Sequence, residues 1–237
     1  NNYNYMVPIT GAGPTCSIIG NLLERGYGVT PHQDHFSSLR NLSAILPDGR
    51  VYNSPLKSIA SKELDDVFQW GIGAYLDGVF TQSNFGIVTE ATISLVRRPK
   101  QVDLFVVQVF DKDLLENIVT EVRECLNELG GVVGGINIMN HRRMLSMQTQ
   151  YMNQSISNSG EILSELEIQN LSKKEDVSSW TVAGAFYKTP DINKAAMKNI
   201  KKRFSKKGYK LRFLNRKKVE LIQKLVKLIP DGLIEGK

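Results

Sequence analysis

The residue pattern of this chain changes at Arg97-Arg98-Pro99, and this change limits the possible folds more than any other feature of the sequence. Before it, short apolar runs alternate with glycines and turn residues. After it, strand-like and helix-like patterns follow one another. Two such different patterns in one chain indicate two domains. We therefore predict one domain at residues 1–99 and a second at residues 100–237.

The second domain alternates strands and helices. Strand-like segments occur at Leu104–Phe110, Val132–Ile138, Trp180–Tyr187 and Lys210–Leu214. Helical spacing occurs at Leu114–Leu129, His141–Gln150, Asp191–Lys206 and Val219–Ile229. Two successive strand–helix–strand units predict an α+β fold, with a ferredoxin-like (split βαβ) sheet and its helices on one face.

Two further expectations concern single segments of this domain. The apolar positions of the Leu114–Leu129 helix predict a single buried face made of Leu115, Ile118, Val119, Val122, Leu126 and Leu129. The segment Asn153–Lys174 is rich in Ser, Asn and Glu, so we expect it to be partly mobile.

The first domain combines turns with a few strong elements. Cys16–Leu23 is a buried-looking stretch interrupted by Gly20, and Ser61–Phe68 is a helix that Ser61 can cap. Leu42–Leu46 and Val51–Asn53 flank a Pro-Asp-Gly-Arg turn and predict a β-hairpin. The alternating, β-branched segment Gly86–Val96 predicts a strand.

Composition and charge exclude several classes of protein. The chain lacks an apolar run of about 18 residues, which a membrane span would need. Its two cysteines, Cys16 and Cys125, are far apart, so neither a disulfide framework nor a zinc site is indicated, and a reducing, cytoplasmic location is favoured. Residues 191–227 contain 14 basic and 2 acidic residues, which fits either solvated helix faces or a module that binds nucleic acid or an anionic surface.

Three segments of the first domain could carry chemistry: Gly11–Asn21, Arg25–Phe36 and Tyr75–Leu95. The first is glycine-rich without being a dinucleotide or phosphate-loop motif, so it is a plain turn or a close-approach loop. The second contains His32, Asp34 and His35, which lack the further ligand that a metal would require; a surface loop capped by Asp34 and a ligand-facing loop both remain open. The third is a loop with glycine at the entry to a strand, suited to a planar heterocycle or to an ordinary tight strand entry.

In chain order these segments read SIIGN (17–21), RGYGVTPHQDHF (25–36), LPDGRVY (46–52) and YLDGVFTQSNFGIVTEA (75–91). This series resembles the flavoprotein family of vanillyl-alcohol oxidase and p-cresol methylhydroxylase. The match lies in Cys16–Phe36, Leu46–Tyr52 and Gly71–Pro99. The resemblance implies the C-terminal half of a PCMH-type FAD-binding domain, followed by a ferredoxin-like substrate cap.

The resemblance also implies roles for individual residues. The cofactor-binding residues would be Ser17, Ile18, Gly20, Asn21, Gly28, Thr30, Gly86, Ile87, Val88 and Thr89. Asp34 would be the catalytic residue near the reactive flavin nitrogen, where it would orient the ring and interact with charge that develops as hydride leaves the substrate. His32 and Gln33 stand where the family's motif has Tyr and Gly.

The function implied is FAD-dependent oxidation of a small alcohol or an alkylphenol-like substrate by hydride transfer to flavin. Oxygen or a redox protein would be the electron acceptor, and a homo-oligomer is compatible with this reading. The family's pyrophosphate-binding loop would precede residue 1, so we expect a partial chain that by itself is inactive and binds FAD poorly. The alternatives are the basic binding module at residues 191–227 and an inactive remnant of a flavoenzyme.

Overall fold

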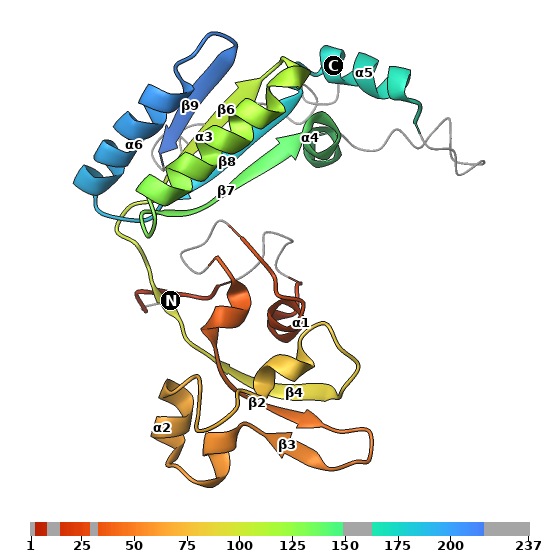
Figure 1. The fold of residues 1–237 in the computed structure, drawn as a ribbon, viewed down its shortest axis with the longest axis vertical. Coiled ribbons are helices and arrows are strands. Elements are labelled where there is room, and N and C mark those ends of the chain that lie inside the picture. The colour runs from red at the N-terminus through yellow and green to blue at the C-terminus, as the bar shows by residue number, and fades with distance from the viewer. Residues whose placement is uncertain (1–2, 9–14, 29–32, 149–162, 216–237) are drawn as a thin grey trace, which may run out of the picture. The chain divides into compact units, whose positions relative to one another are not determined.

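A computed structural model describes residues 3–8, 15–28, 33–148 and 163–215 (Figure 1). The chain forms two compact units, Asn1–Arg98 and Pro99–Lys237. Each unit has its own hydrophobic core, and both combine helices with antiparallel sheet.

Unit 1 (Asn1–Arg98) is built on a three-stranded antiparallel sheet with the order β3–β2–β4. Its strands are β2 (Leu39–Ile45), β3 (Val51–Asn53) and β4 (Ile87–Ile93). The predicted hairpin is therefore confirmed, with Gly49 taking the positive φ of 83° that its turn requires. A second, two-stranded sheet pairs β1 (Tyr5–Met6) with β5 (Val96–Arg97).

Short helices complete unit 1. They are α1 (Ile18–Leu23), α2 (Lys62–Val67) and the 3-10 turns η1 (His35–Ser38), η2 (Pro55–Ser58) and η3 (Asp77–Phe80). The core under α1 is apolar and comprises Leu22, Phe36, Leu39, Leu42, Ala44 and Phe80. As predicted, Ser61 caps α2 by accepting the Leu64 N–H.

One expectation for unit 1 is wrong. The stretch from Cys16 to Leu23 is not a buried run, because Leu22 is the only α1 residue in the core while Cys16 and Ile18 are exposed. A six-residue helix at the surface presents one narrow face to the core, so Leu22 is buried, Leu23 packs against the core while partly buried, and Ile18 remains exposed.

Unit 2 (Pro99–Lys237) contains a four-stranded sheet in which every neighbouring pair is antiparallel. The order is β7–β8–β6–β9, with β6 (Asp103–Val109), β7 (Val133–Asn140), β8 (Trp180–Phe186) and β9 (Tyr209–Asn215). Residues on β6 alternate between fully buried and half-buried, so its two faces have different surroundings.

Two helices cover one face of this sheet. The turn η4 (Lys112–Leu114) leads into α3 (Leu115–Glu128), and α6 (Pro190–Phe204) connects β8 to β9. Both helices contribute to the core that lies against the sheet, and they lie next to each other over it in Figure 1. Helices α4 (His141–Gln148) and α5 (Glu165–Lys174) connect β7 to β8.

One expectation for unit 2 needs correction. The buried face of α3 is Ile118, Val122 and Cys125, whereas Leu115, Val119 and Leu126 are exposed. The end of the segment expected to be partly mobile forms helix α5, which starts at a reciprocal capping box of Ser164 and Glu167; its mobility stays a prediction. The predicted helix at Val219–Ile229 lies outside the described residues, within which no helix is long and apolar enough to cross a membrane.

Candidate functional site

The first motif, SIIGN, forms the start of α1. Ser17 has the extended backbone of an N-cap residue, and its Oγ accepts the Gly20 N–H at 3.0 Å. A serine in this position satisfies one of the free N–H groups of the first turn. Ser17, Ile18 and Gly20 therefore lie together at the surface of α1, where Ile18 leaves 40% of its area exposed.

Asn21, the last residue of this motif, joins α1 to the second motif. Its Nδ2 donates to Nδ1 of the buried His35 at 2.7 Å. The Gly26 N–H donates to the Asn21 carbonyl at 2.8 Å, and the His35 N–H donates to the Gly26 carbonyl at 2.9 Å. A Cβ on Gly26 would lie 2.0 Å from Asn21 Oδ1, so only glycine fits there. His35 thus has a structural role, and the described residues contain no cluster able to hold a metal ion.

Asp34 lies at the surface of the same loop. Its Oδ1 accepts the Phe36 N–H at 3.0 Å and so caps η1. Its backbone pairs with Tyr27, and the Gly28 N–H donates to the Gln33 carbonyl at 3.2 Å. The two flanks of this loop are therefore paired in the antiparallel sense, and the Asp34 side chain is exposed; Thr30 and His32 lie outside the described residues.

The third motif contacts the end of α1. The Gln82 N–H donates to the Leu23 carbonyl at 2.9 Å, and Gln82 Nε2 donates to the Glu24 carbonyl at 3.3 Å. A Cβ on Gly86 would lie 2.8 Å from the Ile45 carbonyl oxygen, so glycine is needed where the chain enters β4. The three motifs are thereby held together in unit 1.

The four predicted residues of the GIVT phrase do not share one environment. Val88 packs against the core beneath α1, whereas Ile87 is 72% exposed. Thr89 donates through Oγ1 to the Ser43 carbonyl, on the sheet face opposite that core. Several apolar side chains of the three motifs are exposed: Ile18, Tyr27, Phe85 and Ile87.

A buried carboxyl group, whose role the sequence did not indicate, links two of the motifs. Asp77 of the YLDG motif is 1% exposed and accepts hydrogen bonds of 2.7 Å from Tyr52 Oη and from Ser54 Oγ. Burial raises the pKa of the Asp77 carboxyl group, while the two hydroxyl donors act against that rise. Burial likewise raises the pKa of the nearby Tyr75 to about 12. These contacts fix η3 against the LPDGRVY hairpin.

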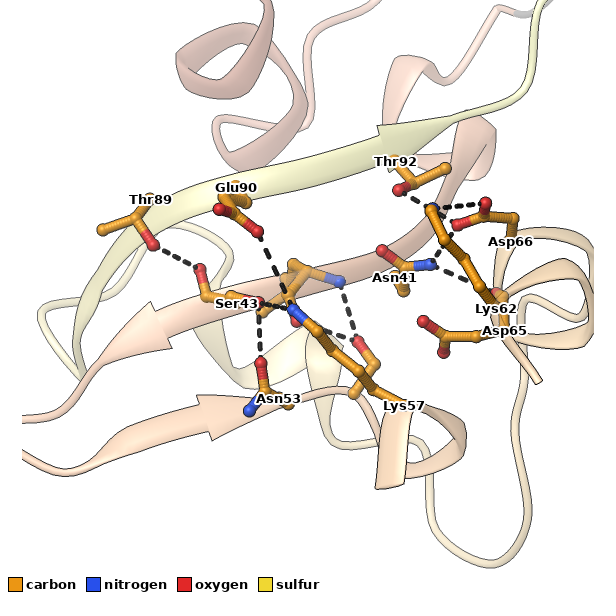
Figure 2. Close-up of polar contacts among 12 residues, drawn as sticks. Asn41, Ser43, Asn53, Lys57, Lys62, Asp65, Asp66, Thr89, Glu90 and Thr92 are labelled. Atoms are coloured by element: carbon orange, nitrogen blue, oxygen red, sulfur yellow. Dashed lines mark hydrogen bonds and ion pairs between the residues drawn. The ribbon is translucent and has the colours of Figure 1, made fainter. Parts of the chain in front are cut away.

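The outer face of the three-stranded sheet carries a polar network (Figure 2). Lys57 Nζ donates to Ser43 Oγ at 2.8 Å and lies 3.7 Å from Glu90, and Ser43 Oγ donates to Asn53 Oδ1 at 2.7 Å. Because Ser43 is a donor to Asn53 and an acceptor from an ammonium group, it is not arranged as a nucleophile. This network holds η2 against the sheet.

The second half of the network attaches α2. Asn41 Nδ2 donates to the Asp65 carbonyl and to Asp66 Oδ1, both at 3.2 Å (Figure 2). Lys62 donates to the Asp66 carboxylate at 2.7 Å and helps lower its pKa. We therefore interpret the outer face as a structural contact surface for η2 and α2.

Comparison with known proteins places these features in context. No family model matches the chain. The chain is 32% identical over 146 residues to 1'-carboxy-chondrochloren decarboxylase of Chondromyces crocatus, covering 62% of this chain and 27% of that protein. It is 31% identical over 123 residues to the 4-cresol dehydrogenase [hydroxylating] flavoprotein subunit of Pseudomonas putida, covering 52% of this chain and 24% of that protein. The matches thus span about a quarter of either curated relative.

The comparison with solved structures concerns the fold. A structure of p-cresol methylhydroxylase with bound substrate matches 91% of this chain with a TM-score of 0.73 at 22% identity, and the match covers 41% of that chain. A 4-ethylphenol oxidase from Gulosibacter chungangensis, in complex with isoeugenol, matches 90% with a TM-score of 0.72 at 20% identity and is covered to 42%. The chain therefore has the fold of part of a PCMH-type flavoprotein, and the resemblance expected from its motifs is confirmed.

Proposed function

We propose that this chain is part of an FAD-dependent oxidoreductase. In this proposal residues 1–99 are the C-terminal half of the flavin-binding domain, and residues 100–237 belong to the substrate cap. The observation that carries the proposal is the pair of contacts that unite the three motifs, from Asn21 to His35 at 2.7 Å and from Gln82 to Leu23 at 2.9 Å. They bring the segments that carry the flavoprotein resemblance into contact within unit 1.

The surface of these motifs is suited to a flat, largely apolar cofactor. Ile18, Tyr27, Phe85 and Ile87 expose apolar area that a ring system would cover. The residues proposed to contact the flavin are those named from the sequence: Ser17, Ile18, Gly20, Asn21, Gly28, Thr30, Gly86, Ile87, Val88 and Thr89. Val88 and Thr89 would do so through the main chain, because their side chains are engaged in the core and with Ser43. Bound flavin would supply the acceptor for a hydride, while the chain orients the ring and excludes water.

Asp34 is proposed as the acidic residue nearest the reaction. Its exposed carboxylate, fixed through Oδ1 on the Phe36 N–H, is already oriented by the chain. Such a carboxylate could interact with positive charge that develops on a substrate carbon during hydride removal.

The proposed substrate class is a small alcohol or an alkylphenol. It is supported by the names of the similar proteins, among them 4-cresol dehydrogenase, p-cresol methylhydroxylase and 4-ethylphenol oxidase, while the remaining relative is named for a carboxylated substrate. The strand order β7–β8–β6–β9, with α3 and α6 as connections, supports a ferredoxin-like cap. Oxygen or a redox protein as electron acceptor, a cytoplasmic location and a homo-oligomer complete the proposal.

The test is a titration of the ¹⁵N-labelled chain with FMN, followed by amide chemical shifts, because this readout does not require tight binding. We expect shifts at Gly20, Asn21, Gly28 and residues 86–88. ADP, which lacks the isoalloxazine ring, is the matched control and should leave these amides unchanged. Shifts confined to other residues, or none at millimolar FMN, would refute the proposed flavin surface.

A variant sharpens this test. Gly20 has room for a methyl group, since its nearest neighbours would be Ser17 Cβ at 3.4 Å and Ser17 Oγ at 3.5 Å. Gly20→Ala should therefore fold normally and yet weaken the FMN response, because the methyl group would occupy the space into which the ring approaches. Unchanged FMN shifts in this variant would place the ring elsewhere.

A further inference from the structure

The four-stranded sheet of unit 2 has a second face, which α3 and α6 do not cover. Phe105, Val107 and Val109 of β6 belong to the core under these helices, and Tyr209, Leu211 and Phe213 of β9 pack against it. Because strand residues alternate between faces, Lys210 and Arg212 of β9 lie on the opposite face, which we call the open face. Both side chains are exposed, whereas Thr181 and Ala185 of β8, on the same face, are buried.

A row of four residues crosses the open face. Asn137 of β7 is paired with Ala183 of β8, Ala183 with Val106 of β6, and Val106 with Arg212 of β9. Neighbouring strands are about 4.8 Å apart, so the row is roughly 14 Å long. Its centre is apolar and half-buried, and it ends in an amide on one side and a guanidinium group on the other.

The charge of the open face has one sign. Of the open-face residues on the four described strands, none is acidic, and the charged ones are Lys210 and Arg212. Lys210 Nζ lies 4.2 Å from the centre of the Phe110 ring, next to the strands. On the helix-covered side, by contrast, Arg203 and Lys206 are paired with glutamates of α3. The open face thus complements an anion.

We propose that the open face binds an aromatic carboxylic acid, with the ring over Val106 and Ala183 and the carboxylate on Arg212. A guanidinium group can bind a carboxylate through two parallel hydrogen bonds, and the Lys210 ammonium group adds a second charge nearby. At the other end of the row, Asn137 can exchange hydrogen bonds with a phenolic hydroxyl group. This inference rests on the proposed function, because it treats the sheet as the substrate cap and specifies a carboxylate on its aromatic substrate.

The experiment uses the complete 237-residue chain with ¹³C-labelled methyl groups and three probes: 4-hydroxyphenylacetate, neutral 4-methylphenol and acetate. The acid should shift the methyl signals of Val106 and Ala183 at concentrations roughly tenfold lower than either of the other probes, since one charge-assisted pair contributes about that factor. Arg212→Gln should remove most of this advantage, and Arg212→Lys should retain part of it. Lys198→Gln, which removes an exposed charge on α6 behind the sheet, should not change it.

Three results would overturn the inference. They are equal responses to the acid and to 4-methylphenol, equal responses to the acid and to acetate, or an equal loss of binding in the Lys198→Gln variant. The FMN shifts in unit 1 distinguish a failure of this inference from a failure of the proposed function. If FMN shifts the expected amides and the acid does not bind, the flavoprotein proposal stands and the carboxylate assignment is wrong. If the acid binds and FMN does not, the open face binds an aromatic carboxylate, but the flavoprotein proposal is wrong and the acid is not the substrate of a flavoenzyme cap.

Discussion

The buried carboxyl group of Asp77 makes the stability of unit 1 depend on pH. Burial raises its folded pKa above the ordinary value of about 4, although Tyr52 and Ser54 donate to it. The folded state therefore binds this proton more tightly than the unfolded chain does. Below about pH 4 both states are protonated. As the pH rises from there to the folded pKa, the contribution of Asp77 to the free energy of unfolding falls, and it is constant above that pKa.

Asp77→Asn removes this titration while keeping the size of the side chain. We expect the free energy of unfolding of the wild type, minus that of the variant, to fall as the pH rises from about 3 towards neutrality. Urea unfolding followed by circular dichroism at several pH values measures this difference. Asp48→Asn, at an exposed aspartate in the β2–β3 turn, is the control and should change stability by less than about 0.5 kcal/mol. A wild-type–variant difference that does not vary with pH would contradict the expectation.

Two glycines of the motifs should respond oppositely to the same substitution. At Gly86 an added Cβ would meet the Ile45 carbonyl oxygen at 2.8 Å and the Phe80 ring at 3.0 Å, so Gly86→Ala should cost roughly 1–3 kcal/mol. At Gly20 the methyl group has room and alanine is the better helix former, so Gly20→Ala should be neutral or stabilising by up to about 1 kcal/mol. Urea midpoints compare the two variants directly, and an equal loss in both would show that the close approach at Gly86 is unimportant.

At the scale of elements, ion pairs join α3 to α6 in unit 2. Glu121 of α3 accepts from Arg203 of α6 at 3.1 Å and is also paired with Lys206, and only 16% of its side chain is exposed. Lys206 first, and Arg203 next, lower the pKa of Glu121. The stabilisation is therefore complete above the ordinary glutamate pKa of about 4.3 and is lost as the pH falls through the lower folded value.

Glu121→Gln should destabilise unit 2 by about 1–2 kcal/mol at pH 7, since it removes the carboxylate that pairs with Lys206 and one of the two carboxylates that pair with Arg203. The difference from the wild type should shrink in acid, where the wild-type carboxylate is protonated, and in 1 M salt, where exposed parts of the pair are screened. Glu124→Gln, on the same helix but in an exposed pair with its neighbour Arg123, should cost less than about 0.5 kcal/mol. Equal losses of stability in both variants would mean that the ion pairs between α3 and α6 stabilise unit 2 no more than an exposed surface pair does.

The sequence predicted elements where local chemistry and tertiary packing agree. The turn at Pro47–Arg50 fixes the β2–β3 hairpin, and β-branched alternation identifies β4, because both signals act over a few residues. The buried face of α3 was partly missed, since Cys125 packs inward at the position seven residues after Ile118 and an exposed Leu126 follows it. The sequence did not predict helix α5, because residues 163–174 are rich in polar side chains. Ser164 and Glu167 form the capping box that could have located its start.

The sequence identified the three motifs of the candidate site, but it did not predict the contacts that join them. The contacts that unite them depend on partners far apart in sequence, such as Tyr52 with Asp77 and Gln82 with the end of α1. No local pattern encodes such pairings. The open-face row from Asn137 to Arg212 likewise appears only once the strand register is known, because each strand contributes a single residue to it.

At the scale of the whole chain, the two units have separate hydrophobic cores that share no residue. Damage to one core should therefore loosen that unit and leave the other protected. Leu42 and Ile118 are suitable probes, because both are buried apolar side chains, at 1% and 0% exposure, one in each unit. Truncation of either to alanine should cost about 2–5 kcal/mol within its own unit.

Hydrogen exchange followed by mass spectrometry of peptides can locate the effect. In Leu42→Ala, amides of β2, β3 and β4 should exchange faster while those of β6 and β8 keep their wild-type rates, because local opening reports the stability of the unit that opens. Ile118→Ala should give the reverse pattern, and each variant thus serves as the control for the other. If either substitution accelerated exchange equally in β2 and in β6, the two cores would unfold as one cooperative structure, and the division at Arg98–Pro99 would be a feature of the fold without being a boundary of stability.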